Sequence, residues 1–441
     1  MPQRHVIVGS GIAGLSAAEA IRLADPEATI TMIGEEPHEF YSRPGLAYLL
    51  RGDIPERQLF LRTAQDQKDL RMHRMHKRVE KLLLEQHAVQ LTNGQAVVYD
   101  RLLLATGALA SAPPFTGGNL LGVVKLDSLD DTRGILRFAS RFRSAVVVGG
   151  GITALELAEG LRARGMRVHY FLRGLRYWSD VLDETESEIV LGRLQHEGIR
   201  VHLQTQIKRA IGNRGRITAV ETEAGKTIPC SLLAVAIGVR PRIDLAREAG
   251  LTVDRGIVVN EYLQTSVPDV FASGDAAQVL DPRTGVATLD VLWPIALRQG
   301  QIAGANMVSL GQAYQKDVPF NVTQLTGLKT TIIGAVGGGG TSEDSVAINR
   351  GESESWRLTP NSWVLSDRDD VNRVRLLLDD RCLIGALVMG DQAWSRPLHR
   401  LIQSRVDITP VRAALAVGGR AALEQLALFY QQWEKSPAQN G

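Results

Sequence analysis

The chain has 441 residues, too many for one compact core, so we expect two or three domains. A formal net charge of +2 and a charged fraction of 22% give no reason to expect nucleic acid or an anionic membrane as a partner. No apolar run approaches the roughly 20 residues that span a bilayer. The N-terminal residues run directly into a buried type of strand, which leaves no room for a signal peptide.

The first elements are a strand, a glycine-rich turn, a helix and a second strand, over residues 5–36 (HVIVGSGIAGLSAAEAIRLA and ATITMIGEE). The same order returns over residues 144–174, in SAVVVGGGITALELAEGLRARG and RVHYFLRG. Strand, helix and strand in this order indicate a parallel βαβ unit. Two such units, well separated in the chain, predict an α/β fold with two doubly wound, Rossmann-like dinucleotide-binding domains.

Shorter strands lie between and after these units. Asn93-Gly94 separates two alternating apolar segments and predicts a tight hairpin. Three segments predict a buried strand that runs into a turn at a glycine: RLLLATGA (101–108), SLLAVAIGVRPR (231–242) and DVFASGDAA (269–277).

The sequence changes in character from about Asn321 onward. VGGGGTSEDS (336–345) is typical of a flexible turn, and NRVRLLLDDRCLIGALVMGD (372–391) resembles a hairpin of an antiparallel sheet. The last stretch, 409–435, predicts a helix that Gly418-Gly419 interrupts. We therefore expect a third, smaller α/β domain over residues 316–441.

The first glycine-rich turn has the pattern Gly9-x-Gly11-x-x-Gly14. In a dinucleotide-binding turn the first glycine allows the tight turn, the second lets a pyrophosphate approach the backbone, and the third lets helix and strand pack closely. An acid about twenty residues further on accepts hydrogen bonds from the ribose, and Glu35 lies at that distance, with Glu36 as the next choice. The alternative is that these glycines only allow close packing.

The second turn has the pattern Gly149-x-Gly151-x-x-Ala154, in which alanine replaces the third glycine as the fingerprint permits. We expect it to bind a second dinucleotide. The alternative is a site that has kept the fold and lost the ligand.

The strand after the second turn ends without the expected acid, in Leu172 and Arg173. A carboxylate at this place accepts hydrogen bonds from the ribose hydroxyls of NADH and repels the 2′-phosphate of NADPH. Arg173 and Arg176 predict charge-assisted hydrogen bonds to such a phosphate. The sequence favours NADPH, and the alternatives are NADH, use of both nucleotides, or no nucleotide.

The two cysteines, Cys230 and Cys382, are far apart and form no CxxC or CxxxxC pair. This spacing argues against a disulfide framework, a thiolate metal site and a paired redox disulfide, and it predicts a cytoplasmic protein. His73 and His76 stand among arginines and a lysine. We interpret that run as a solvated basic face rather than a metal site, with docking of an acidic carrier protein as the alternative.

With both turns, LLLATG, VAIGVRP and VFASGDAA in this order, residues 4–310 resemble the two-dinucleotide flavoproteins of the pyridine nucleotide–disulfide oxidoreductase family. PHEFYSRPGL and CLIGALVMGD look most similar to the branch without a redox disulfide: rubredoxin and ferredoxin reductases and the flavin module of nitrite reductases. The resemblance implies FAD on residues 1–110 and 240–315, and NADPH or NADH on residues 111–239. It also implies hydride transfer to the flavin, an electron acceptor that is a rubredoxin- or ferredoxin-like protein or a small molecule, and a homodimer.

The resemblance further implies roles for single residues. Arg43 would line the flavin or its phosphates, Asp275 would bind the ribityl or pyrophosphate region, and Trp293 would lie near the isoalloxazine. Each has a plainer alternative: a surface arginine, a helix N-cap before AAQVL, and a core tryptophan. The residues expected to bind the cofactors are Gly9, Gly11, Ala13, Gly14, Glu35, Glu36, Arg43, Thr106, Gly107, Gly149, Gly151, Ala154, Arg173, Arg176, Gly238, Gly274, Asp275 and Trp293.

Two positions depart from the family pattern. YSRPGLAY has Pro44 at the place of the reactive cysteine, so no thiol is expected beside the flavin. The ferredoxin-reductase branch pairs a lysine with a glutamate of the second glycine-rich helix; here Glu156 is present, but Tyr48 stands in the lysine position. Glu156, the candidate catalytic residue, therefore lies near the nicotinamide or is a partly buried carboxyl with a raised pKa. The alternative function is a redox sensor or interaction module with little turnover.

Overall fold

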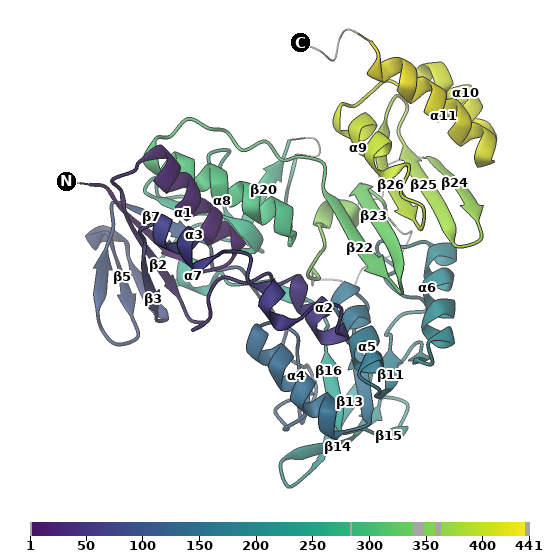
Figure 1. Ribbon diagram of the computed structural model, residues 1–441, viewed down its shortest axis with the longest axis horizontal. Coiled ribbons are helices and arrows are strands. Elements are labelled where there is room, and N and C mark those ends of the chain that lie inside the picture. The colour runs from purple at the N-terminus through teal and green to yellow at the C-terminus, as the bar shows by residue number, and fades with distance from the viewer. Residues whose placement is uncertain (1, 283–284, 338–347, 358–362, 437–441) are drawn as a thin grey trace. The chain divides into compact units, whose positions relative to one another are not determined.

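The structure is a computed structural model that describes residues 2–282, 285–337, 348–357 and 363–436. The chain forms two compact units, whose elements are labelled in Figure 1. Unit 1 consists of Met1–Phe171, Thr205–Lys316 and Val346–Ser353. Unit 2 consists of Leu172–Gln204, Asp317–Ser345 and Glu354–Gly441. Within the described residues, no helix is long and apolar enough to cross a membrane. The turn predicted over 336–345 lies almost entirely outside the described residues.

The first sheet of unit 1 is parallel throughout. Its strands, in spatial order, are β19 (Val270–Ala272), β7 (Arg101–Leu104), β1 (Arg4–Val8), β2 (Thr29–Gly34) and β3 (His73–His76). The sheet therefore combines the first βαβ unit with two of the strands that were predicted to end at a glycine. His73 and His76 are exposed on β3, at the edge of this sheet.

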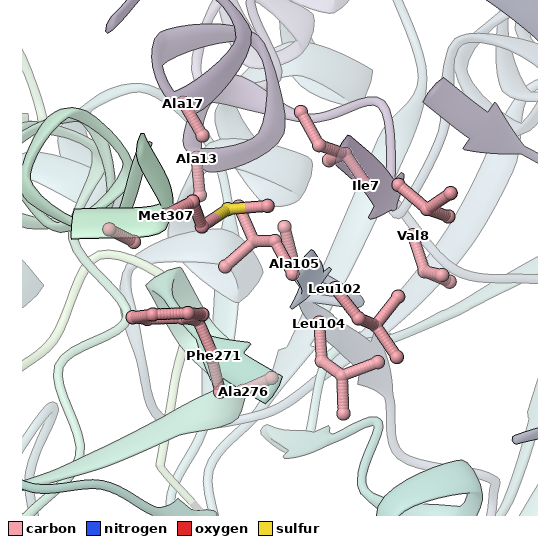
Figure 2. Packing of buried hydrophobic residues seen from close by; sticks show 14 of the residues in the cluster. Ile7, Val8, Ala13, Ala17, Leu102, Leu104, Ala105, Phe271, Ala276 and Met307 are labelled. Carbon is pink, nitrogen blue, oxygen red and sulfur yellow. The ribbon is translucent and has the colours of Figure 1, made fainter. Parts of the chain in front are cut away.

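Helices α1 (Ile12–Ala24) and α8 (Trp293–Val308) pack against each other in unit 1 (Figure 1). Two glycines of α8 make this close approach possible, because a Cβ on Gly300 would lie 2.2 Å from the carbonyl oxygen of Ala13, and one on Gly304 would lie 2.4 Å from that of Ala17. Figure 2 shows part of the core here, with buried side chains from α1, α8 and the strands β1, β7 and β19. The packing fixes α8 on the helix that follows the first glycine turn.

The second parallel sheet of unit 1 contains, in spatial order, β11 (Arg167–Phe171), β10 (Ser144–Val148), β16 (Leu232–Val235) and β9 (Val123–Val124). It confirms the second βαβ prediction. Helix α5 (Ile152–Ala163) follows the second glycine turn, and α4 (Leu129–Arg141) precedes β10. The short helix α2 (Gly45–Arg51) packs on α5, where a Cβ on Gly160 would lie 2.7 Å from Leu50.

Smaller elements complete unit 1. The sheet β4-β5-β6 is antiparallel, and Gly94, with φ +83°, lies in its predicted hairpin. The ribbon β8–β17 pairs the segments that follow the LLLATG and VAIG strands. The remaining elements are α3 (Ala64–Asp69), β4 (Val79–Leu83), β5 (Ala88–Leu91), β6 (Ala96–Val98), β8 (Ala108–Ala110), β13 (Ile207–Asn213), β14 (Arg216–Thr222), β15 (Thr227–Pro229), β17 (Val239–Pro241), α7 (Asp244–Glu248), β18 (Ile257–Val258), β20 (Ala277–Asp281) and β21 (Val286–Thr288).

Unit 2 is built on an antiparallel sheet with the order β22-β23-β26-β25-β24, which confirms the hairpin predicted over 372–391. The predicted break at Gly418-Gly419 separates α10 from α11, and both glycines have positive φ. The elements are α6 (Glu184–His196), β12 (Arg200–His202), β22 (Phe320–Leu325), β23 (Leu328–Gly334), β24 (Trp363–Asp369), β25 (Asn372–Leu378), β26 (Leu383–Met389), α9 (Ser395–Gln403), α10 (Arg412–Val417) and α11 (Gly419–Glu434).

Helix α6 joins this unit through buried charges. Arg375 of β25 donates from Nε to Glu186 Oε1 (2.9 Å) and from Nη2 to the carbonyl oxygen of Val181 (2.7 Å). Arg373 binds Glu186 as well, over 3.2 Å, and also pairs with Asp183, the N-cap of α6. Two cations therefore compensate the fully buried carboxylate at the start of this helix. The domain boundaries expected from the sequence stay a prediction.

Candidate functional site

The first glycine turn has the geometry that a dinucleotide needs. Gly9 has φ +120°, and a Cβ there would lie 2.0 Å from the carbonyl oxygen of Ala105. A Cβ on Gly14 would lie 2.1 Å from the carbonyl oxygen of Gly9, so helix and strand approach closely. At Gly11, the N-cap of α1, no atom lies within 4 Å of the position of a Cβ. A diphosphate would find open space there, next to the free N–H groups of the helix N-terminus.

Residues of the SGD segment pack against this turn. A Cβ on Gly274, which has φ +73°, would lie 3.0 Å from the Cβ of Ala13. The backbone N–H of Gly274 donates to Gln299 Oε1 of α8 over 2.8 Å. Burial raises the pKa of Asp275. The alternative of Asp275 as a helix N-cap is wrong, because AAQVL continues into strand β20, which pairs with β18 and β21.

The two candidate ribose acids have different surroundings. Glu35 directly follows β2 and lies 3.6 Å from both Arg78 and Arg242. Glu36 accepts a hydrogen bond from the Tyr41 hydroxyl over 2.5 Å. The Glu35 side chain is 45% exposed and that of Glu36 only 27%. Glu35 is therefore the acid that remains available to a ribose.

Arg43 is held from several sides. Its guanidinium pairs with Glu36, lies 5.3 Å from the centre of the Tyr41 ring, and donates to the carbonyl oxygen of Asp127 over 2.6 Å. These partners contradict the alternative of an ordinary surface arginine. Arg43 is therefore a fixed cation in the segment that follows β2 and Glu35.

Asp127 and Arg350 form an ion pair that sequence reasoning missed. Arg350 also donates to the carbonyl oxygen of Ala108 over 3.4 Å, and Lys125 lies 3.3 Å from the Asp127 carboxylate. Burial opposes the ionisation of Asp127, but Arg350, Lys125 and Arg43 outweigh it and lower the pKa of this carboxyl. The charges of Arg350 and Arg43 also act on Asp275, so these groups belong to one electrostatic cluster. The 223 positions between Asp127 and Arg350 leave no local signal for this pair.

The ends of the two connecting strands meet in one hydrogen-bonded turn. The Thr106 hydroxyl donates to the carbonyl oxygen of Arg242 (2.7 Å), and the Arg242 N–H donates to that of Gly107 (2.8 Å). Gly107 and Gly238 both have positive φ, at +70° and +106°. The structure therefore places Thr106 and Gly107 beside Arg242, which is also one of the two arginines near Glu35.

Trp293 is the first residue of α8, and its ring is only partly buried. Its ring centre lies 5.9 Å from that of Phe40, at an interplanar angle of 39°. Trp293 also packs on the edge of the main core cluster. Both sequence interpretations, core residue and cofactor neighbour, are compatible with this position.

The second glycine turn has the same backbone geometry but a different environment. Gly149 has φ +144°, a Cβ there would lie 1.9 Å from the carbonyl oxygen of Ala236, and Ala154 is fully buried at the third position. At Gly151, however, a Cβ would lie 2.5 Å from the Cγ of Asn349. A side chain from a remote segment therefore covers the glycine that a pyrophosphate would approach.

Glu156 lies on α5 and is partly buried. Burial, and after it the charge of Glu159, raises the pKa of Glu156 to about 8, against the opposing charges of Arg51 and Arg350. This confirms the predicted raised pKa. Tyr48, in the lysine position, is 40% exposed, and the Arg51 guanidinium lies 5.6 Å from the centre of its ring. Arg51 thus supplies, three residues later on α2, a cation whose charge reaches Glu156.

The residues that follow β11 belong to unit 2. Leu172 is buried, and its N–H donates to the carbonyl oxygen of His202 over 2.9 Å, whereas Arg173 is exposed and Arg176 partly buried. Leu172 therefore packs into the protein. Arg173 is the residue after this strand that offers a charge to solvent.

Thiol and metal chemistry depend on where the two cysteines and the candidate metal ligands lie in the fold. Cys230 and Cys382 are buried and unpaired, and burial raises the pKa of Cys230 to about 12. No group of three or more histidine, cysteine, aspartate or glutamate side chains in the described part of the chain has an arrangement that could hold a metal ion.

Comparison with known proteins shows which family contains a chain with these two glycine turns. Residues 3–300 match the family described as pyridine nucleotide-disulphide oxidoreductase. The chain belongs to this family. A relative, the NADH oxidase of Methanocaldococcus jannaschii, is 31% identical over 79% of this chain and 78% of its own length. The ferredoxin–NAD(+) reductase component of the biphenyl dioxygenase system of Paraburkholderia xenovorans is also 31% identical, over 91% of this chain and 94% of its own.

The solved structures of the family support the fold. The ferredoxin reductase of a Rhodopseudomonas palustris system superposes with a TM-score of 0.82 at 25% identity, over 93% of this chain and 97% of that chain. Putidaredoxin reductase, in its covalent complex with putidaredoxin, gives a TM-score of 0.82 at 23% identity, over 92% and 94%. The chain spans only 48% of another relative, the nitrite reductase of Bacillus subtilis.

Membership of the family identifies the chain as an FAD-dependent NAD(P)H oxidoreductase, as the resemblance implied. Both glycine turns have the backbone shape of the dinucleotide fingerprint, but only the first is open. Gly11 leaves room for a diphosphate, and a Cβ at this position would occupy that room. The second turn also has a positive φ at its first glycine, +144° against +120°, but is covered by Asn349. A diphosphate therefore has open space at the first turn, whereas at the second turn Asn349 occupies it.

Proposed function

We propose that FAD binds at the first turn and that a nicotinamide dinucleotide, NADPH in preference to NADH, binds at the second. The open position at Gly11 carries the first assignment. Leu172 and Arg173 carry the second, because the strand end has no acid to repel a 2′-phosphate. Several relatives have NADH or NAD(+) in their names, so the proposed preference for NADPH rests on the strand end of this chain alone.

When bound, FAD would supply the redox chemistry, namely acceptance of a hydride and release of electrons. Glu35 would accept hydrogen bonds from the ribose, and the N-terminus of α1 would hold the pyrophosphate. Arg43 and Asp275 bind the rest of FAD, supported by the charge of Arg350. The N-terminus of α8 begins at Trp293 and provides a positive dipole end that stabilises negative charge at the flavin. Glu156, with its pKa near 8, keeps a neutral carboxyl on the nicotinamide side at neutral pH.

We further propose that the acceptor is a small electron-carrier protein of the ferredoxin or rubredoxin kind. The names of several relatives support it, among them the ferredoxin–NAD(+) reductase component and rhodocoxin reductase. The buried cysteines support it as well, because they leave no accessible thiol for a disulfide substrate.

An anaerobic titration tests this function. The purified yellow protein should lose its visible flavin absorbance on addition of NADPH, and a ferredoxin or rubredoxin should then reoxidise it. An unchanged spectrum with both nucleotides would instead favour a binding module with little turnover. Reduction without transfer to either carrier would leave the flavin assignment standing and remove the proposed acceptor class.

A homodimer and a cytoplasmic location are part of the same proposal. The dimer is supported by large apolar side chains that are exposed on unit 2, namely Val364, Val417 and Leu428. The cytoplasm is supported by the two unpaired cysteines. Light scattering of the purified protein measures the mass directly, and a monomer at micromolar concentration would refute the dimer.

A further inference from the structure

The residues that cover the second turn form a short segment, Ile348–Ser353, which we term the strap. The strap is part of unit 1 although the neighbouring chain belongs to unit 2. At its start, the Val239 N–H donates to the carbonyl oxygen of Ile348 over 2.8 Å. At its end, the Gly351 N–H and the carbonyl oxygen of Glu352 bind the backbone of Val291, each over 2.9 Å. Backbone hydrogen bonds of the β type thus hold the strap at both ends.

Buried polar groups secure the same ends. Ser353 donates to Asp290 Oδ1 over 2.5 Å, and the other carboxylate oxygen of Asp290 pairs with Lys316 over 2.5 Å. Both Lys316 and Asp290 are buried, so separating them would leave a charge without compensation. Arg350 adds the ion pair with Asp127. The strap is therefore fixed on unit 1 by backbone hydrogen bonds and by buried or partly buried ion pairs.

Asn349 lies directly on the second turn. A Cβ on Gly151 would lie 2.5 Å from its Cγ, 2.7 Å from its Nδ2 and 2.9 Å from its Cβ. Glu352 holds it there, because its carboxylate accepts from Asn349 Nδ2 over 2.6 Å and from the Asn349 backbone N–H over 3.1 Å. The carboxamide consequently has one preferred position, against Gly151.

We propose that Asn349 determines the affinity of the nicotinamide-nucleotide site, because NAD(P)H must displace its carboxamide to reach Gly151. The inference rests on the proposed binding of a nicotinamide nucleotide at this turn. The second glycine of the fingerprint exists so that a pyrophosphate can approach the backbone. Asn349 and a pyrophosphate cannot both occupy this approach. The apparent affinity is then the intrinsic affinity multiplied by the fraction of molecules in which Asn349 has moved away.

Calorimetric titration of the FAD-loaded protein with NADP⁺ and with NAD⁺ tests the proposal. Asn349→Gly should bind both nucleotides more tightly, by about threefold or more, because the competent fraction rises. Asn213→Gly, at an exposed position of the β13–β14 hairpin, should bind them as the parent does. An unchanged or weaker affinity of Asn349→Gly would overturn the proposal, since the carboxamide would then be outside the path or a ligand. If Asn349→Gly does not fold, Asn349→Ser shortens the side chain and retains a hydroxyl for Glu352.

A second measurement examines the contact without any nucleotide. Gly151→Ala should lower the melting temperature in the parent, because the new Cβ meets Asn349, and should lower it less in the Asn349→Gly background. Equal losses in both backgrounds would show that Asn349 does not lie on Gly151 and would overturn the proposal. If neither nucleotide binds any variant while the melting temperatures still depend on each other, the proposed function fails and the contact stands.

Discussion

At Gly11 no atom lies within 4 Å of the position of a Cβ, whereas at Gly151 the Cγ of Asn349 lies 2.5 Å from it. The backbone is otherwise alike, because Gly9 and Gly149 both have a positive φ and both approach a carbonyl oxygen to about the same distance, 2.0 and 1.9 Å. The comparison teaches that the glycine fingerprint specifies the shape of the backbone. Access to that backbone is decided by residues that the fingerprint does not contain.

The strands after the two turns differ in the same way. Glu35 follows β2 as an exposed acid between Arg78 and Arg242, while Leu172 follows β11 as a buried residue. An exposed carboxylate can bind ribose hydroxyls, and a buried leucine can only pack. An exposed acid thus follows the strand after the first turn, whereas the charge that follows the strand after the second turn is the exposed Arg173.

Closing the open turn should have the largest effect. Gly11→Leu fills the space next to the N-terminus of α1, so the pyrophosphate of FAD loses its approach and the protein should be isolated without colour. The matched control is Gly150→Leu on the second turn, where no atom lies within 4 Å of a Cβ either and flavin should be retained. The ratio of visible to ultraviolet absorbance measures the flavin content, and circular dichroism verifies folding. A folded Gly11→Leu protein with full flavin content would refute the assignment of this turn.

The arginines after β11 should give the next largest effect. Arg173→Ala and Arg176→Ala each remove a charge-assisted hydrogen bond to a 2′-phosphate, which should lower kcat/KM for NADPH on the order of ten- to a hundredfold and leave NADH nearly unaffected. Arg200→Ala, an exposed arginine of β12, is the control. Steady-state rates with both nucleotides give the ratio. A parent that prefers NADH, or two variants with an unchanged ratio, would exclude these arginines as the phosphate site.

The sequence predicted those features that short stretches of chain determine. Both βαβ units, the hairpin at Asn93-Gly94 and the break at Gly418-Gly419 follow from local periodicity and from the φ that glycine allows, and all are present. The raised pKa of Glu156 was also predictable, because a carboxyl among the small residues of a buried helix is poorly solvated.

The features that failed or were missed depend on distant contacts. Asp275 reads locally as an N-cap, but AAQVL pairs with strands that compete successfully for its backbone. Arg350 neutralises Asp127, and Asn349 covers Gly151, across about two hundred positions in each case. A single sequence carries no periodic signal for such pairs. The roles of Arg350 and Asn349 are therefore visible only in the folded structure, which brings them to Asp127 and Gly151.

A smaller effect is expected at Glu156 on α5, the helix that follows the second turn, where the stability of the protein should depend on pH. The pKa of Glu156 is about 8 in the folded protein against 4.5 for an ordinary glutamate, so between these values the folded state binds the additional proton. Stability contributed by this group is present below about pH 4.5 and is lost progressively as the pH rises to about 8. Glu156→Gln has no such proton and should gain melting temperature over the parent by a few degrees at about pH 8, and less at about pH 5.

The exposed Glu80 of β4 gives the control for that prediction, because Glu80→Gln should show no comparable dependence on pH. Calorimetric melting curves of the FAD-loaded proteins at both pH values are sufficient. A Glu156→Gln advantage that is equal at both pH values would mean that the carboxyl is not protonated preferentially in the folded state. Glu156 would then be an ionised acid whose charge is balanced by Arg51 and Arg350.

The smallest effect is expected from the cysteines, which lie outside both turns. Cys230 is buried among Ile217, Ile228 and Leu233, and a thiol with a pKa of about 12 remains protonated and is a poor nucleophile. Cys382 donates to the carbonyl oxygen of Arg405 over 3.2 Å in unit 2. The double variant Cys230→Ser, Cys382→Ser should therefore reduce an artificial acceptor with NADPH at the parent rate per bound flavin.

The serine hydroxyl that replaces the Cys230 thiol has to be buried, which costs about 1–3 kcal/mol of stability where it finds no partner. The rate is therefore compared only between proteins of equal flavin content, and Cys230→Ala serves as the second variant because it buries no polar group. A folded, flavin-loaded double variant without activity would place a thiol in the electron path. Electron flow would then require a cysteine in addition to the two glycine turns.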